Sequence, residues 1–70
     1  MNAYKHVVQP PPPISEQIQA VEDTIISMRQ SYMHTLGEHQ GKITDPIAAR
    51  DIARLEAALD TLKRVAMVRF

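Results

Sequence analysis

Two stretches of the sequence carry apolar side chains at steps of four and three residues, which is the spacing of one side of an α-helix. The first stripe consists of Ile14, Ile18, Val21, Ile25, Met28, Tyr32 and Leu36. The second stripe consists of Ala48, Ile52, Leu55, Leu59, Leu62 and Ala66. The segment between them is polar, contains glycine and has no period. These features predict an all-α chain with helix one at about 15–37, a loop at 38–45 and helix two at about 46–68.

The residues at the expected helix ends support these boundaries. Ser15 suits the N-cap of helix one, and Gly37 or Gly41 suits its end because glycine accepts a left-handed backbone. Asp45 followed by Pro46 is a strong start signal for helix two, since aspartate accepts free N–H groups and proline favours the first helical position. Helices of similar length joined by a short loop predict an antiparallel hairpin over residues 14–70.

Four consecutive prolines, Pro10 to Pro13, precede helix one. Proline has no backbone N–H to donate and disfavours the α conformation in the residue before it. Residues 1–13 are therefore expected to form an extended N-terminal arm with a stiff polyproline segment. The arm could reach a neighbouring subunit, could be a disordered tail that ends in a proline stop, or could be a proline motif for an aromatic groove.

The chain has 70 residues and no cysteine, so apolar side chains alone must build its core. A domain of this size buries only about 60% of the surface of its unfolded chain, which makes self-association the available source of stability. Alanines along helix two provide a second, small-residue surface for an interface. We expect a homo-oligomeric helical bundle with the following core: Ile18, Val21, Ile25, Met28, Tyr32, Ile52, Leu55, Leu59 and Leu62.

Eight basic and eight acidic residues cancel, which argues against general nucleic-acid binding. The N-terminus does not resemble a signal peptide and no apolar run is long enough to span a membrane, so we expect a cytoplasmic protein. His34 and His39 are five residues apart and would lie on different faces of a helix, unlike a metal-binding pair four apart. The sequence predicts no metal, no cofactor and no catalytic activity.

Two groups of residues are candidates for ligand binding. In the arm, Tyr4, Lys5 and His6 combine an aromatic ring, a fixed cation and a titratable ring, which can stack on a base and approach a phosphate. Near the C-terminus, Arg64 and Arg69 offer planar donors suited to phosphate. The alternatives are a frayed polar terminus for the first group and favourable charge at a helix C-terminus for the second.

The arm with Tyr4 and Lys5, the two long helices and the segment from Leu55 to Ala66 together resemble the hairpin family of phage anti-CBASS sponges. The positions that match the family's second-helix pattern are Leu55, Ala58, Leu59, Leu62, Arg64 and Ala66. Asp60 departs from that pattern, because the family favours a bulky apolar residue there, and the four-proline arm and the lack of a proline-containing tail are further departures.

The resemblance implies a homo-oligomer, commonly a hexamer, that sequesters cyclic oligonucleotide signals between subunits and so evades host immunity. It implies that Tyr4 stacks on a base, Lys5 pairs with a phosphate and Arg64 faces a pocket at a subunit junction. The first alternative is a small helical adaptor or inhibitor that binds a host protein. The second is a hairpin dimer that binds structured RNA, against which the neutral charge counts.

Overall fold

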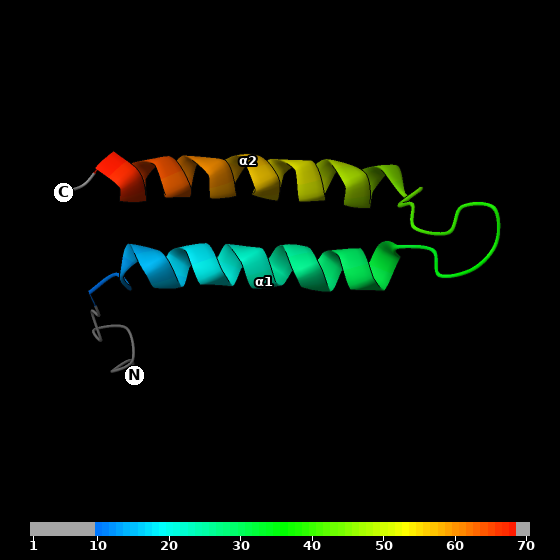
Figure 1. The fold of residues 1–70 in the computed structure, drawn as a ribbon, viewed down its shortest axis with the longest axis horizontal. Helices are drawn as coiled ribbons and strands as arrows, with labels where there is room; N and C mark the ends of the chain where they lie inside the picture. The colour runs from blue at the N-terminus through cyan, green and yellow to red at the C-terminus, as the bar shows by residue number, and fades with distance from the viewer. Residues whose placement is uncertain (1–9, 69–70) are drawn as a thin grey trace, which may run out of the picture.

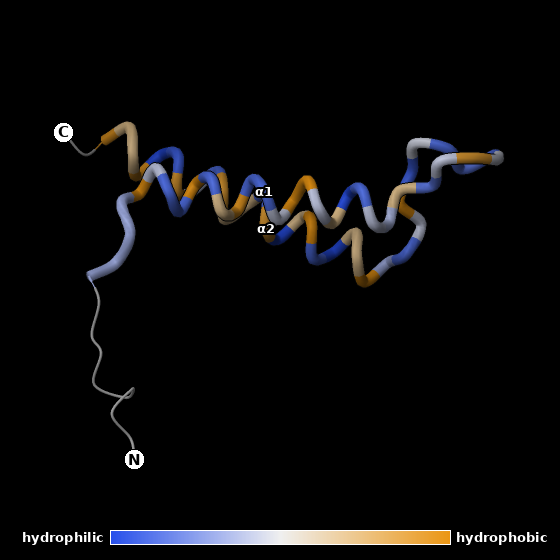
Figure 2. The backbone as a smooth tube through the Cα atoms, turned by 90° about the horizontal axis from the view of Figure 1, so that it is seen from below, coloured by the Kyte–Doolittle hydropathy of each residue, from blue (hydrophilic) through white to orange (hydrophobic). Residues whose placement is uncertain are grey.

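The protein folds as an antiparallel hairpin of two helices, which confirms the all-helical architecture expected from the sequence. The computed structural model describes residues 10–68. Helix α1 spans Ile14–Tyr32 (19 residues) and α2 spans Pro46–Val68 (23 residues). The helices lie side by side, and the connecting loop is at one end of the pair (Figure 1). Seen from below, the two helices overlap at the end away from the loop and diverge toward the loop, so they cross at an angle (Figure 2).

Helix α1 begins at Ile14, with Pro13 as its N-cap and not the serine that the sequence indicated. The carbonyl of Pro13 accepts hydrogen bonds from the backbone N–H groups of Glu16 (3.0 Å) and Gln17 (3.1 Å). The Gln17 side chain also donates to the carbonyl of Pro12. Ser15 therefore lies inside the first turn, and this helix start has no side-chain cap. The expectation of a serine N-cap was wrong because the proline carbonyls already accept these N–H groups.

Helix α1 also ends earlier than expected, at Tyr32 and not at Gly37. The backbone of Met33 is extended (φ −74°, ψ 133°). The N–H of His34 donates to the carbonyl of Lys42 (3.0 Å), and the N–H of Gly41 donates to the carbonyl of His34 (2.8 Å). These loop hydrogen bonds replace the next helical turn. Tyr32 is consequently 46% exposed at the helix end, and Leu36 lies in the loop at 82% exposure.

The loop therefore spans residues 33–45, which is longer than the expected 38–45. Both glycines lie inside it with positive φ angles, 87° for Gly37 and 81° for Gly41. In this conformation an L side chain would be strained, which is why glycine is suited to both positions. The N–H of Gln40 donates to the carbonyl of Gly37, and the N–H of Lys42 donates to that of His39, so the loop is a chain of tight turns.

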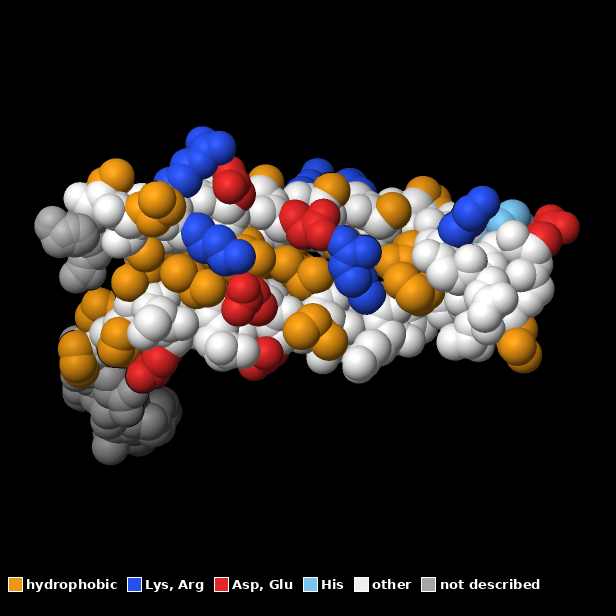
Figure 3. Space-filling model, viewed as in Figure 1, with side chains coloured by type: hydrophobic (Ala, Val, Ile, Leu, Met, Phe, Trp, Pro, Cys, Tyr) orange, Lys and Arg blue, Asp and Glu red, His pale blue; other side chains and the backbone are white. Residues whose placement is uncertain are grey.

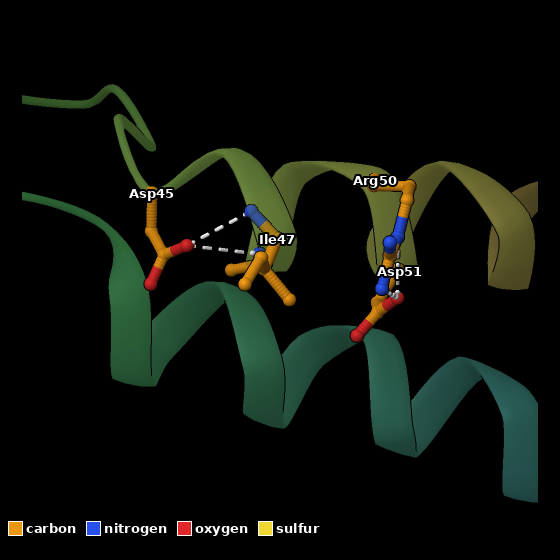
Figure 4. Close-up of polar contacts among 5 residues, drawn as sticks. Asp45, Ile47, Arg50 and Asp51 are labelled. Atoms are coloured by element: carbon orange, nitrogen blue, oxygen red, sulfur yellow. Dashed lines mark hydrogen bonds and ion pairs between the residues drawn. The ribbon is translucent and has the colours of Figure 1, made fainter.

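Helix α2 starts and ends at the residues expected from the sequence. An oxygen of the Asp45 carboxylate accepts hydrogen bonds from the backbone N–H groups of Ile47 (2.9 Å) and Ala48 (3.2 Å) (Figure 4). Pro46 occupies the first helical position, where its missing N–H costs nothing. The two helices thus begin differently, α2 with a side-chain cap and α1 with backbone carbonyls alone.

The core of the described residues is small. Three side chains are buried, Ile25 at 7%, Ala48 at 3% and Ile52 at 4% exposure, and all three lie in the half of the hairpin nearer the loop. Other members of the two stripes are only half-buried, namely Ile18, Val21, Met28, Leu55, Leu59 and Leu62. The hairpin therefore covers its own apolar stripes incompletely.

The N-terminal arm is described only from Pro10 onward. Pro10 to Pro13 are exposed and not helical, and Pro13 has φ −56° and ψ 153°, which is close to polyproline II geometry. The rest of the expected arm, residues 1–9, lies outside the described residues.

Candidate functional site

Most residues expected to bind a ligand lie outside the described part of the chain. Tyr4, Lys5 and His6 precede residue 10, and Arg69 follows residue 68. Arg64 is the expected ligand residue that the structure describes. Its side chain is 77% exposed and forms an ion pair with Asp60 one helical turn earlier (2.8 Å). By its position in the helical repeat, Arg64 lies on the side of α2 opposite the core stripe, where its charge is partly balanced by Asp60.

One flank of the hairpin is closed by ion pairs between the helices. The Arg29 guanidinium on α1 pairs with the Glu56 carboxylate on α2, and Glu22 on α1 pairs with Lys63 on α2 at 3.4 Å. We call these four residues the paired flank. Figure 3 shows apolar side chains along the furrow between the helices, crossed by acidic and basic side chains. The four side chains of the paired flank are between 37% and 52% exposed, so they remain in contact with solvent.

Two shallow grooves adjoin the paired flank. The first has a volume of about 250 Å³ and lies near the loop. Its lining includes the apolar side chains of Met33, Ile43 and Ile52 and the Arg29–Glu56 pair. The second has a volume of about 410 Å³ and is lined by Gln19, Glu22, Ile25, Ile26, Glu56 and Leu59. The second groove has two carboxylates and no cation in its lining. Neither groove offers an uncompensated cation for a phosphate.

The opposite flank of α2 is different. Ile47, Asp51, Arg54 and Ala58 follow one another at steps of four, three and four, so they form one stripe beside the core stripe. We call these four residues the open flank. Ile47 is 61% exposed, Arg54 and Ala58 are exposed, and the Asp51 side chain is 41% exposed. Within residues 10–68, none of these four side chains forms an ion pair or hydrogen bond with α1.

The charges of the open flank are poorly partnered within the described chain. Asp51 accepts hydrogen bonds from its neighbour Arg50, from Nε at 3.3 Å and from an Nη atom at 3.2 Å (Figure 4). Adjacent helical residues do not face each other, so this pair is exposed to solvent and weak. No hydrogen bond or ion pair of the Arg54 side chain is present in the described part of the molecule.

The two histidines meet in the loop, where both are exposed to solvent, and not on different faces of a helix. His34 Nε2 is 2.7 Å from the Thr44 hydroxyl, and the ring centroids of His34 and His39 are 5.6 Å apart. His39 Nε2 lies 3.5 Å from the Glu38 carboxylate. Residues 10–68 contain no group of three or more side chains placed to hold a metal ion. His34 connects the two ends of the loop, which is a structural role that the sequence did not indicate.

The ion pairs between the helices were also missed from the sequence. Glu22 and Arg29 flank the α1 stripe at a spacing of seven residues, and Glu56 and Lys63 flank the α2 stripe at the same spacing. In an antiparallel hairpin such pairs of opposite charge can face each other, so this matched spacing was the available signal. The rotation of each helix about its axis was needed to assign the partners.

The chain was compared with protein-family models, with curated proteins and with solved structures, and none of them matches it. Neither described helix has a stretch long and apolar enough to cross a lipid bilayer.

Proposed function

We propose that this protein is a non-enzymatic, self-associating hairpin that sequesters a small anionic ligand, a cyclic oligonucleotide, at the junctions between its subunits. The observation that carries the proposal is the small core. Only Ile25, Ala48 and Ile52 are buried among the described residues. A hairpin with so little buried apolar surface gains stability by covering its half-buried stripes with other copies.

The subunit junction is the preferred location for the ligand because one hairpin holds few suitable groups. A cyclic oligonucleotide presents flat bases and several phosphates, so its site needs aromatic rings and cations in repeated copies. The chain has two tyrosines, Tyr4 and Tyr32, and one phenylalanine, Phe70. Symmetry multiplies each of these groups at a junction.

The choice of a cyclic oligonucleotide is supported by the resemblance to the anti-CBASS sponges. In that scheme Tyr4 stacks on a base, Lys5 and His6 approach a phosphate, and Arg64 and Arg69 contribute positive charge from α2 and the residues after it. Arg64 would exchange its Asp60 partner for the ligand, because this pair is exposed and therefore weak. The biological consequence would be the removal of an immune signal without its degradation, inside the cytoplasm of an infected host.

The test is native mass spectrometry of the purified protein before and after addition of a panel of cyclic di- and trinucleotides, followed by calorimetry of each hit. We expect an oligomer that gains the mass of intact nucleotide. Tyr4→Ala and Lys5→Ala should each weaken binding at least about tenfold, because base stacking and charge-assisted hydrogen bonds each contribute about 1–3 kcal/mol. Lys42→Ala, in the loop at the far end of the hairpin, is the matched control and should bind normally.

Three results would contradict the proposal: no binding of any nucleotide, undiminished binding after deletion of residues 1–9, or turnover of the nucleotide. If nothing in the panel binds and a single host protein copurifies in stoichiometric amount, the adaptor function would replace the sponge. Preferential binding of structured RNA would favour the RNA-binding hairpin.

A further inference from the structure

The two flanks of α2 differ in whether α1 supplies partners for their charged side chains. On the paired flank, Glu56 and Lys63 are neutralised by residues of α1. On the open flank, Ile47 is 61% exposed and Asp51 pairs with the adjacent Arg50. Within residues 10–68, the Arg54 side chain forms no hydrogen bond or ion pair. The open flank thus combines an exposed aliphatic side chain, two opposite charges and the small residue Ala58. We infer that the open flank of α2 is a self-association surface, on which a second copy of this chain packs its own α2 antiparallel across a two-fold axis.

The order of the residues on the open flank specifies the register. In an antiparallel pair related by a two-fold axis, each residue faces a residue of the second copy, and the same contact occurs twice. When the axis passes between Ile52 and Ala53 in sequence, Asp51 faces the second copy's Arg54, and Arg54 faces the second copy's Asp51. Ile47 then faces the second copy's Ala58. A shift of one heptad in either direction along the same stripe separates the opposite charges. Charge complementarity therefore selects a single register.

The sizes of the side chains fit this register. Ala58 is small, so the larger Ile47 of the second copy can pack over it while the helix axes stay close, because interaxial distance depends on the side chains at the contact. Ile47, Asp51 and Arg54 lie in the first half of α2 together with the buried Ala48 and Ile52, and Ala58 lies just past the midpoint of the helix. The surface is thus backed by the best-packed part of the hairpin, which holds its side chains in position.

This inference deepens the proposed function by naming the surface through which two copies meet, and it rests on that function only in requiring self-association.

The test of this surface uses no nucleotide. Sedimentation velocity of the full chain over a range of concentrations should show self-association for the wild type. Asp51→Arg and Arg54→Asp should each weaken it at least about tenfold, since like charges then face each other twice. The double variant Asp51→Arg/Arg54→Asp restores the opposite charges and should recover association. Glu56→Arg, a single charge reversal on the paired flank, is the matched control and should leave association unchanged.

Disulfide cross-linking tests the register separately, because the chain has no cysteine of its own. Ile47 and Ala58 are eleven residues apart on one helix, about 16 Å, which is too far for a disulfide within one chain. The variant Ile47→Cys/Ala58→Cys should therefore form covalent dimers on mild oxidation, whereas Ile47→Cys alone should not.

The inference is overturned by a monomeric wild type, by unchanged association in both single charge reversals, by a double variant that is not restored, or by cross-linking of Ile47→Cys alone, which indicates parallel helices. Circular dichroism of each variant separates these outcomes from unfolding. If the open flank is not the interface but nucleotide still binds, the proposed function stands. If the open flank is the interface but no nucleotide binds, the ligand is withdrawn and the interface stands.

Discussion

Both flanks of the hairpin carry side chains of opposite charge, but the flanks differ in where those charges find partners. The paired flank connects α1 to α2 through Arg29–Glu56 and Glu22–Lys63. The open flank also carries opposite charges, but within residues 10–68 none of its side chains is linked to α1 by an ion pair or hydrogen bond. Charged side chains alone therefore do not indicate an interface between copies of the chain. A charged surface is available for such an interface only where the same chain does not already supply partners for its charges.

The largest effect is expected in the core between the two flanks. Ile52→Asp would place an unpaired charge at a position that is 4% exposed, which should cost several kcal/mol and unfold the hairpin. Far-ultraviolet circular dichroism during heating, at one fixed protein concentration, measures the loss. Ala57→Asp, on the outer side of the same helix, is the control and should melt close to the wild type. Equal melting of both variants would contradict the assigned core.

A smaller effect is expected from the start of α2, where the open flank begins. Asp45→Ala removes the acceptor for two backbone N–H groups and should lower the free energy of unfolding by about 0.5–2 kcal/mol. Ser15→Ala removes the residue that the sequence indicated as the cap of α1 but that lies inside the helix, so it should change stability little. Urea unfolding of the two variants gives both values. A larger loss for Ser15→Ala would show that α1 begins differently.

The paired flank should contribute less than the cap of α2. Arg29→Met removes one exposed ion pair between the helices and should cost less than about 1 kcal/mol. Because these charges remain in contact with solvent, the difference from the wild type should shrink at high salt. Urea unfolding of Arg29→Met, Glu56→Gln and the double variant, each at low and high salt, forms a mutant cycle. A coupling free energy of zero at both salt concentrations would remove the distinction between the flanks.

The smallest effect is expected in the loop. His34→Gln removes the ring that meets Thr44, but the contact is exposed, so the loss should stay below about 1 kcal/mol. His39→Gln should have even less effect, because its contact with Glu38 is exposed and long. Amide hydrogen exchange of residues 34–42 measures the loop directly. We expect faster exchange in His34→Gln than in His39→Gln, and the reverse order would contradict the structural role of His34.

The sequence by itself determined that two helices form, and it determined both ends of α2. Its apolar stripes repeat at the helical spacing, and Asp45 with Pro46 marks the start of α2 through contacts within a few residues. The Asp60–Arg64 ion pair is similarly local, because its partners are four residues apart in the sequence. Signals of this kind are readable because all the interacting groups lie within one or two turns of each other.

The tertiary structure decided where α1 ends and which flank remains open. Helix α1 stops at Tyr32 because the backbone of His34 pairs with Gly41 and Lys42, which are distant enough in sequence that no local signal announces the contact. The partners of Arg29 and Glu22 depend on how each helix is rotated about its axis, and the apolar stripes alone specify that rotation too loosely to assign them. The open flank is the part of α2 left over once these contacts are made, because it turns away from the α1 side chains that neutralise Glu56 and Lys63.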